Sequence, residues 1–203
     1  MYRRRYESHL TRIADSLATL IGDYVTGLTH IDRIAARAKD PGRFEAKAKK
    51  AIDGRLKYAS PLTQIQDQIG ARVIVFYKDD VARVASRVER YFKPVERQDL
   101  VPDSEWEFGY FGRHWIFALP LDVVPSGVDS SECPRFFELQ VKTLYQHAWS
   151  EANHDLGYKV VGEVSSDQLR RFAYASAQSW GADRVFEELR AEILGETSVR
   201  DER

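Results

Sequence analysis

Hydrophobic positions along the 203-residue chain switch between a helical spacing and short continuous runs. Leucine and isoleucine recur every three or four positions in residues 7–28, which predicts an amphipathic helix. The same spacing predicts a second helix in "HIDRIAARAKD", ended by "DPG" at residues 40–42, and a third in "RFEAKAKKAIDGRLKY", interrupted at Gly54. "SPLTQIQDQIG" opens with Ser60 and Pro61, which are typical of a helix start, and predicts a short helix or turn.

Short runs rich in β-branched and aromatic residues follow, and they are too short for core helices. "ARVIVFY", "RHWIFALPL" and "RFFELQVKT" therefore predict strands, and "KDDVARVASRVERYF" predicts an amphipathic helix after the first of them. The alternation predicts one α/β (α+β) domain over residues 1–203 with a small mixed sheet. Within it we expect N-terminal helices over about residues 7–57, the sheet over about 60–145 and C-terminal helices over about 146–196.

The last segment, "SDQLRRFAYASAQSWGADRVFEELRAEIL", predicts one long helix or a pair of helices. Its large hydrophobic side chains have two possible uses, the joining of subunits in an oligomer or packing on the protein's own sheet. We favour the second, because an amphipathic helix in a small domain usually covers its own core. The side chains concerned are Phe172, Tyr174, Trp180, Val185 and Phe186.

Composition excludes several classes of protein. The net charge of −1 excludes a uniformly basic nucleic-acid binder but leaves room for a local basic face. The single cysteine, Cys133, cannot form an internal disulfide. No stretch approaches the ~20 apolar residues of a membrane span, and the start "MYRRRYESHL" lacks the apolar core of a signal peptide. We therefore expect a cytoplasmic protein that does not engage a membrane.

Residues 33–57 form a basic cluster, in which nine lysines and arginines outnumber three acids. One interpretation is a solvated helical face. The other is a polyphosphate site, because four of the cations flank a turn and a helix start, where backbone N–H groups and side chains can share one anion. These four are Arg37, Lys39, Arg43 and Lys47. The pattern alone leaves both interpretations open.

Glu138 stands between the apolar neighbours Phe137 and Leu139 in the predicted strand "FFELQV". An isolated buried carboxylate costs several kcal/mol unless a cation, a metal or hydrogen bonds hold it. Asp67 lies just before the strand "ARVIVFY", so the two carboxylates would come together if the strands are neighbours. Such a pair would suit one Mg²⁺, which prefers a few carboxylates plus waters and phosphate oxygens. Alternatively, Asp67 caps a helix and Glu138 faces solvent.

Gly109 and Gly112 flank aromatic residues in "EFGYFGRHWIF". Because glycine permits close backbone approach, Tyr110 is a candidate for stacking on a base, although a turn with core aromatics explains the segment equally well. The histidines of the chain lack the i, i+4 spacing of a zinc-binding helix, and we expect no zinc site.

Taken together, the motifs resemble the synthetase domain of the RelA/SpoT family, in particular its stand-alone small alarmone synthetases. "RAKDPGRFEAK", "DQIGARVIV", "GYFGRH" and "FELQVKTLYQHAWSEANHDLGYK" occur in the family's order, and the resemblance covers about residues 10–195. It implies a nucleotidyltransferase-like mixed sheet of about five strands with helices on both sides. It also implies an ATP-dependent pyrophosphokinase that transfers pyrophosphate to the 3′-hydroxyl of GDP or GTP and so makes (p)ppGpp.

The resemblance assigns roles on the ATP side of the site. The family's magnesium aspartate falls on Asp67, and Arg72 is its basic partner near the phosphates. Glu138 takes the place of the catalytic glutamate, which orients or deprotonates the 3′-hydroxyl and helps to hold Mg²⁺. The family's ATP-binding pattern falls on Arg37, Lys39, Arg43 and Lys47.

On the acceptor side, Tyr110 takes the place of the tyrosine that stacks on the acceptor base, and His114 would help to shape that site. Four more residues belong to the matching block and would either contact the acceptor or support packing. They are Gln140, Lys142, His147 and His154.

The chain also departs from the family pattern. Asp40 and Arg43 replace small hydroxyl residues of the ATP motif. The segment "PDSEWEFGY" carries Glu105 and Glu107 where the family has a phosphate-contacting lysine, and acids beside phosphates are unfavourable. The acceptor end is therefore altered, whereas the ATP end and Glu138 match the family.

Three functions follow from this comparison. The first is an alarmone synthetase that uses a guanine or adenine nucleotide as acceptor. The second is a toxic synthetase that pyrophosphorylates the 3′ end of tRNA, with an antitoxin protein as partner. It would hold RNA on a basic surface such as Arg3, Arg4 and Arg5 or Lys49, Lys50 and Lys57. The third is an inactive nucleotide-binding module, against which Asp67 and Glu138 argue.

No hydrolase motif is apparent, so we expect synthesis only. The oligomeric state stays open.

Overall fold

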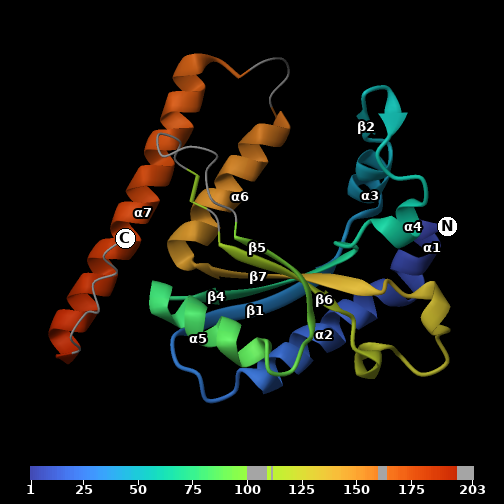
Figure 1. The fold of residues 1–203 in the computed structure, drawn as a ribbon, viewed down its shortest axis with the longest axis horizontal. Helices are drawn as coiled ribbons and strands as arrows, with labels where there is room; N and C mark the ends of the chain where they lie inside the picture. The colour runs from blue at the N-terminus through green and yellow to red at the C-terminus, as the bar shows by residue number, and fades with distance from the viewer. Residues whose placement is uncertain (100–108, 111, 160–163, 196–203) are drawn as a thin grey trace.

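The computed structural model describes residues 1–99, 109–110, 112–159 and 164–195. A five-stranded mixed sheet with the order β1-β4-β7-β6-β5 forms its centre (Figure 1). Strands β4 and β7 are parallel, and the other neighbouring pairs are antiparallel. The strands are β1 (Ile31–Ala38), β4 (Ile69–Val75), β5 (Pro94–Asp99), β6 (Arg113–Ala118) and β7 (Phe136–Thr143).

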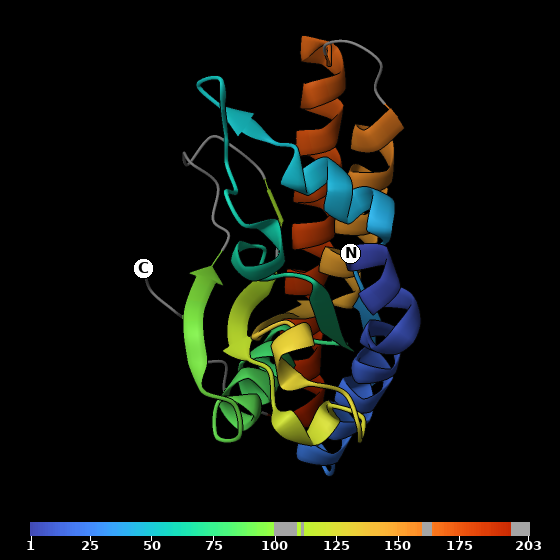
Figure 2. The same ribbon diagram turned by 90° about the vertical axis from the view of Figure 1, so that its right-hand side faces the viewer.

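The remaining described elements are mainly helices. They are α1 (Tyr2–Arg5), the π-helical turn η1 (Tyr6–Leu10), α2 (Thr11–Tyr24), α3 (Pro41–Ala48), α4 (Pro61–Gln64), α5 (Lys78–Val88), the 3₁₀ turns η2 (Leu121–Val123) and η3 (Ser130–Glu132), α6 (Leu144–Lys159) and α7 (Ser166–Leu194), together with the hairpin β2 (Ala51–Ile52) and β3 (Arg55–Leu56). Helices α2 and α5 lie on one side of the sheet, and α3, α4 and α6 lie on the other, whereas α7 runs past the end of the sheet alongside α6 and α5 (Figures 1 and 2). This arrangement confirms the expected fold class.

The hydrophobic core lies between the sheet and the helices α2 and α5. Ile13, Leu17 and Ile21 repeat at helical spacing along α2 and are fully buried. They belong to one cluster with the inward residues of the central strands, such as Phe117 and Phe137. The periodicity that predicts this helix therefore corresponds to its buried face. Among the described residues, no helix is long and apolar enough to cross a membrane.

The predicted helix in residues 30–40 is wrong, because this segment forms the edge strand β1. The strand pairs antiparallel with β4, and its register shifts between Ile31 and Arg33. This irregularity places both Ile31 and Ile34 against the core, three positions apart, which imitates the period of a helix. The pattern likewise does not predict the opposite edge strand, β5.

The predicted helix in residues 43–58 is correct only as far as α3. Beyond it, the chain forms the β2–β3 hairpin, in which Asp53 and Gly54 both adopt positive φ angles, 50° and 75°. This conformation is that of a type I′ turn, for which Asp-Gly is a preferred sequence. The "DPG" segment begins a helix here rather than ending one, because Asp40 is the N-cap and Pro41 is the first residue of α3.

Helix α7 is one continuous helix, but its packing contradicts the favoured interpretation. Its described residues that are buried are polar: Ser176, Asp183 and Arg190. Among the predicted core residues, Tyr174 is 67% exposed and Val185 is 53% exposed. Helix α7 packs on α6 and α5 rather than on the sheet (Figure 1). Because its hydrophobic side chains point outward, α7 does not cover the core of its own domain.

Candidate active site

Strand β7 has one apolar face and one polar face. Phe137, Leu139 and Val141 are fully buried in the core. Because side chains alternate along a strand, Glu138 and Gln140 point to the opposite face of the sheet. That face is not covered by α2 or α5, so the glutamate in an apolar run belongs to the floor of a cleft.

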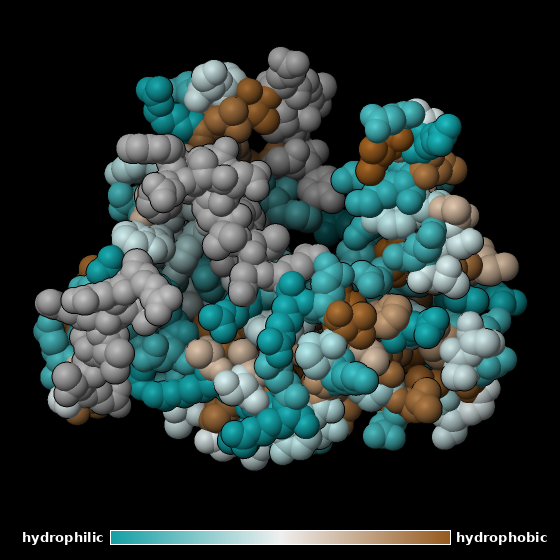
Figure 3. All heavy atoms as spheres, viewed as in Figure 1, coloured by the Kyte–Doolittle hydropathy of each residue, from teal (hydrophilic) through white to brown (hydrophobic). Residues whose placement is uncertain are grey.

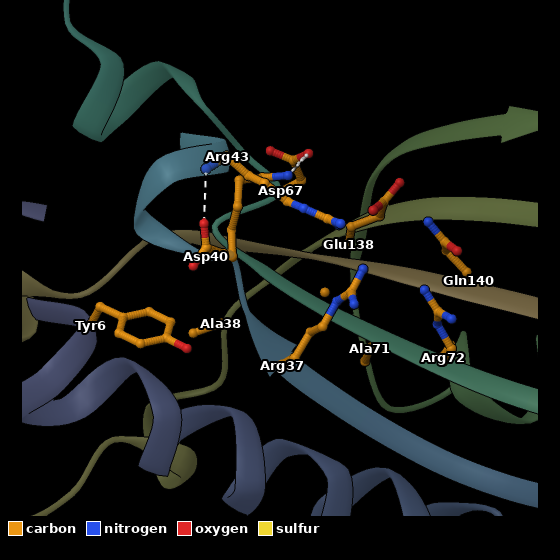
Figure 4. Close-up of a pocket in the computed structure, with 12 residues that line it drawn as sticks. Tyr6, Arg37, Ala38, Asp40, Arg43, Asp67, Ala71, Arg72, Glu138 and Gln140 are labelled. Atoms are coloured by element: carbon orange, nitrogen blue, oxygen red, sulfur yellow. Dashed lines mark hydrogen bonds and ion pairs between the residues drawn. The ribbon is translucent and has the colours of Figure 1, made fainter. Parts of the chain in front are cut away.

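The strand register extends this polar floor across the sheet. Glu138 on β7 lies opposite Gly70 on β4, and Gly70 lies opposite Arg37 on β1. In the next row, Gln140 lies opposite Arg72. Figure 4 shows the side chains of Arg37 and Arg72 on the same side of the sheet as those of Glu138 and Gln140. Residues far apart in the sequence thus share one surface because of the strand pairing.

A cleft of about 810 Å³ lies above this floor. Figure 3 shows the surface hollowed beside α3 and the β2–β3 hairpin, where most of the atoms are hydrophilic. The walls come from α3 on one side and α6 on the other. The cleft brings together the sequence-predicted site residues other than Tyr110 and His147, namely Arg37, Lys39, Arg43, Lys47, Asp67, Arg72, His114, Glu138, Gln140, Lys142 and His154.

Asp67 is held between two lysines at the ATP side of the predicted site. Its Oδ2 lies 3.0 Å from Lys39 Nζ and accepts a hydrogen bond from Lys47 Nζ at 2.8 Å. Burial alone would raise the pKa of Asp67, but the lysines outweigh it and the pKa is lowered. Asp67 is therefore an anion at neutral pH. Its Oδ1 is buried without a hydrogen-bond partner in the structure.

Asp40, the unexpected acid beside the ATP cluster, points into its own helix. Its Oδ1 accepts hydrogen bonds from the backbone N–H groups of Gly42 at 2.9 Å and Arg43 at 3.1 Å. This is a helix N-cap, which explains an acid at this position. The cap also occupies two of the N–H groups that were expected to bind phosphate. Anion binding at this turn is therefore left mainly to the side-chain cations.

Glu138 faces His114 across the β6–β7 pair. His114 Nδ1 lies 3.2 Å from Glu138 Oε1. Burial would raise the pKa of Glu138, but the hydrogen bond from His114 and its charge outweigh burial, so the pKa is lowered. His114 Nε2 is buried and has no hydrogen-bond partner in the structure. The Glu138 carboxylate and a His114 ring nitrogen without a hydrogen-bond partner thus lie together on the lining of the cleft.

The carboxylates fit a magnesium ion better than a zinc ion. The described residues contain no group of three or more His, Cys, Asp or Glu side chains placed to share a metal. Asp67 has a buried oxygen without a partner, and its negative charge acts on Glu138. Among the described residues, Asp67 and Glu138 are therefore the two carboxylates that could hold the ion. This suits Mg²⁺, which takes its other ligands from water and phosphate.

Lys142 lies at the far end of the floor from Arg37. It is 5% exposed, and its Nζ donates a hydrogen bond to Ser150 Oγ at 3.1 Å. Burial, with a smaller contribution from the nearby Arg72, lowers its pKa to about 8. A lysine that titrates so close to neutrality is responsive to a bound anion.

Tyr110 is the candidate that the structure separates from the cleft lining. It is 8% exposed, and its hydroxyl donates a hydrogen bond to Asp183 of α7. The expected stacking surface of Tyr110 is thus turned into the protein. Phe111 and the segment 100–108, with Glu105 and Glu107, lie outside the described residues.

Several residues that line the cleft are not predicted from the sequence. Glu151 on α6 pairs with Arg72 at 2.9 Å. It is four positions from His147 and three from His154, so helical spacing was the signal that could have identified it. Ser150, on the same helix as Glu151, accepts a hydrogen bond from Lys142 of β7. Tyr6, in the π-helical turn, lines the cleft beside Arg37 and Asp40, as Figure 4 shows.

Comparisons with known proteins concern the family and the fold of this chain. Residues 36–163 match a family model described as a region found in RelA and SpoT proteins. A GTP pyrophosphokinase of Bacillus subtilis, YjbM, is 26% identical over 176 residues, which are 84% of this chain and 77% of the relative.

Solved structures show the same fold. The small alarmone synthetase 1 from Bacillus subtilis, bound to its product pppGpp, has a TM-score of 0.69 at 24% identity, over 95% of this chain and 94% of that one. A GTP pyrophosphokinase family protein from Streptococcus pneumoniae has a TM-score of 0.71 at 20% identity, over 90% of this chain and 91% of that one. At these identities the likeness concerns the fold.

Proposed function

This chain belongs to the family of RelA and SpoT proteins, and from that premise we propose that it is an ATP-dependent nucleotide pyrophosphokinase. The proposed reaction transfers pyrophosphate from ATP to the 3′-hydroxyl of GDP or GTP, giving (p)ppGpp-type alarmones. The single observation that carries this proposal is the convergence of Asp67, Glu138 and the cations from β1, α3 and β4 in one cleft. The named relative, a GTP pyrophosphokinase, supports the same reaction class.

The proposed chemistry needs charge neutralisation and a positioned hydroxyl. The acceptor's 3′-oxygen forms a bond to the β-phosphorus of ATP while the bond from that phosphorus to the bridging α-phosphate oxygen breaks. AMP leaves with the bridging oxygen, and the hydroxyl proton passes toward Glu138. Arg37, Lys39, Arg43 and Lys47 would hold the phosphates, and Arg72 would lie beside them.

Glu138 suits an orienting role in this reaction. Its lowered pKa keeps it ionised at neutral pH, so it can accept a hydrogen bond from the 3′-hydroxyl. The same lowered pKa makes it a weak base, so its main contribution is to fix the hydroxyl for in-line attack. His114, which touches Glu138, would keep that carboxylate in place and offers Nε2 to the acceptor ribose.

We propose that Asp67 and Glu138 hold Mg²⁺. When bound, the ion would neutralise charge on the ATP phosphates. Before it binds, Lys39 and Lys47 compensate the Asp67 carboxylate. Both lysines line the cleft, so they would also lie within reach of the ATP phosphates.

The 3′ end of tRNA is a second candidate acceptor, favoured by the position of the β2–β3 hairpin. Lys50 lines the cleft, and its carbonyl accepts a hydrogen bond from the Lys57 backbone N–H, so the base of the hairpin adjoins the site. Arg55 and Lys57 are exposed on the same projection. A cationic arm at the mouth of the cleft suits an RNA backbone. The N-terminal arginines are less suited, because Arg4 is paired with Glu132 at 2.9 Å.

One assay tests both candidates. Purified protein is incubated with Mg²⁺ and ATP labelled at its β- or γ-phosphate, and separately with GDP, GTP, adenine nucleotides or deacylated tRNA. Label on guanine nucleotides supports the first candidate, and label on tRNA alone replaces it with the second. Absence of transfer to every acceptor would refute a pyrophosphokinase. Glu138→Gln, which keeps the shape of the side chain and removes its charge, is the matched control.

A further inference from the structure

Asp183 is a buried carboxylate that the proposed reaction does not use. It lies in the middle of α7 and is 2% exposed. Its Oδ2 accepts two hydrogen bonds at 2.5 Å each, one from the Tyr110 hydroxyl and one from the Thr143 hydroxyl. These partners are 73 and 40 residues away in the sequence. One oxygen of α7 therefore joins the acceptor-side loop to the end of β7.

Thr143 is itself fixed by the start of α6. Its Oγ1 accepts a hydrogen bond from the Gln146 backbone N–H at 3.1 Å, and Gln146 Oε1 accepts one from the Thr143 N–H at 2.9 Å. This reciprocal pair is a capping box. Since the helix N–H already uses the threonine oxygen as an acceptor, the hydroxyl proton is directed to Asp183. The carboxylate is thus aligned by a rigid element.

The loop that begins at Tyr110 leads directly to the proposed site. Gly112 lies so close to β7 that an added Cβ would come within 2.4 Å of Lys142 Cγ and 2.5 Å of the Val141 carbonyl oxygen. Two residues later, His114 contacts Glu138. Gly112 and His114, which contact Lys142 and Glu138, therefore lie only two and four positions after Tyr110 in the sequence.

Packing alone does not account for a carboxylate at this position. The other buried residues of the described part of α7, Ser176 and Arg190, lie seven positions away on either side, so the stripe that faces the domain is polar. A leucine at position 183 would pack α7 without the desolvation cost of a carboxylate. What a carboxylate adds is the capacity to accept both hydroxyl hydrogen bonds on one oxygen.

We propose that Asp183 is a positioning residue for the acceptor side of the site, acting by fixing Tyr110, which precedes Gly112 and His114 in the sequence. Helix α7 then contributes to acceptor binding although none of its residues lines the cleft. The inference rests on the proposed pyrophosphokinase function, and it assigns a specificity role to a helix remote from the reacting atoms.

The test is steady-state kinetics on the intact protein with ATP and the guanine nucleotide acceptor. Asp183→Ala is expected to raise the KM for the acceptor about tenfold, the effect of losing one strong hydrogen bond, and to leave the KM for ATP nearly unchanged. Tyr110→Phe should give the same split, and the double variant should add nothing further to the acceptor KM, because both changes remove the hydrogen bond between Tyr110 and Asp183. Asp183→Asn should restore most of the affinity, because its carbonyl oxygen can accept both bonds.

Arg190→Met is the matched control on the same stripe. Arg190 lies over the Tyr77 ring, 5.0 Å from its centroid, and away from the acceptor loop. Its replacement should loosen α7 without changing the acceptor KM. Three results would each overturn the inference. Asp183→Ala could leave the acceptor KM unchanged, it could raise the KM for ATP and for the acceptor equally, or Arg190→Met could have the same effect as Asp183→Ala. If Asp183→Ala does not fold, Tyr110→Phe and Asp183→Asn decide by the same criteria. A wild-type protein without transferase activity would instead refute the proposed function itself.

Discussion

Raising the pH from 7 to 9 should weaken acceptor binding through Lys142. The pKa of this buried lysine is lowered to about 8. It would therefore be a cation in about nine of ten molecules at pH 7 and in about one of ten at pH 9. A hydrogen bond between this cation and a phosphate contributes roughly 1.5–3 kcal/mol, so the neutral form would bind a phosphorylated acceptor much less well. The affinity for the acceptor should therefore follow the fraction of molecules in which Lys142 is a cation.

The expected result is a fall of about tenfold in kcat/KM for the acceptor between pH 7 and pH 9, with saturating ATP. This quantity reports the pKa of the free enzyme, which is the state that the structure describes. Lys142→Met is the control, because methionine fills the same narrow space without titrating. The variant should show a flat profile at the high-pH level of the wild type.

Stability measurements give an independent check on the same group. Between pH 8 and its ordinary pKa of 10.5, Lys142 is neutral in the folded protein and charged in the unfolded chain. The unfolded state then binds more protons, so the free energy of unfolding should rise with pH across this window, by at most ~3 kcal/mol. Urea titrations should show this slope in the wild type and lose it in Lys142→Met. A flat kinetic profile in the wild type, or the same inflection in Lys142→Met, would refute the reasoning.

Three further predictions concern the surroundings of the site. Tyr2→Phe should raise the KM for ATP a few-fold and leave the acceptor KM unchanged. The reason is that the Tyr2 hydroxyl donates a hydrogen bond to the Lys39 carbonyl at 2.8 Å while the Tyr2 ring stacks on Phe44. A rise in both KM values would contradict this prediction. Asp40→Ala should lower the free energy of unfolding by about 1 kcal/mol in urea titrations through loss of the α3 cap, and an unchanged midpoint would show that the cap is not needed. Burial and the neighbouring Asp79 raise the pKa of Glu187 to about 7, so the stability that its proton provides should be lost as the pH rises from about 4.5 to 7. Melting temperatures at pH 5 and pH 8 should show this loss in the wild type but not in Glu187→Gln.

The sequence carried most of the information about the floor of the cleft. Alternation in "FFELQV" identifies Glu138 as an outlier, and the position of Asp67 before a neighbouring strand brings the second carboxylate to it. Both inferences need only the period of a strand and the pairing of two strands. The cations from Arg37 to Lys47 follow because they are close together in the sequence.

Other features depend on irregularities that periodicity does not represent. The register shift in β1 gives two isoleucines a helical spacing within a strand. The pair Asp53-Gly54 is a local signal for a hairpin, but the helical pattern before it predicts a helix through the same residues. The burial of Tyr110 depends on Asp183, a residue 73 positions away whose polarity contradicts the expected role of α7 as a core helix. Long-range polar contacts of this kind have no counterpart in a hydrophobic pattern.

Transfer of labelled pyrophosphate by the wild type and by Glu138→Gln tests the central claim most directly. The account predicts labelled 3′-pyrophosphorylated guanine nucleotide from the wild type, and a loss of at least about a hundredfold in kcat from the variant. The variant should melt at a temperature close to that of the wild type, since the amide replaces the carboxylate at the same position. Wild-type rates from a correctly folded Glu138→Gln protein would contradict the account.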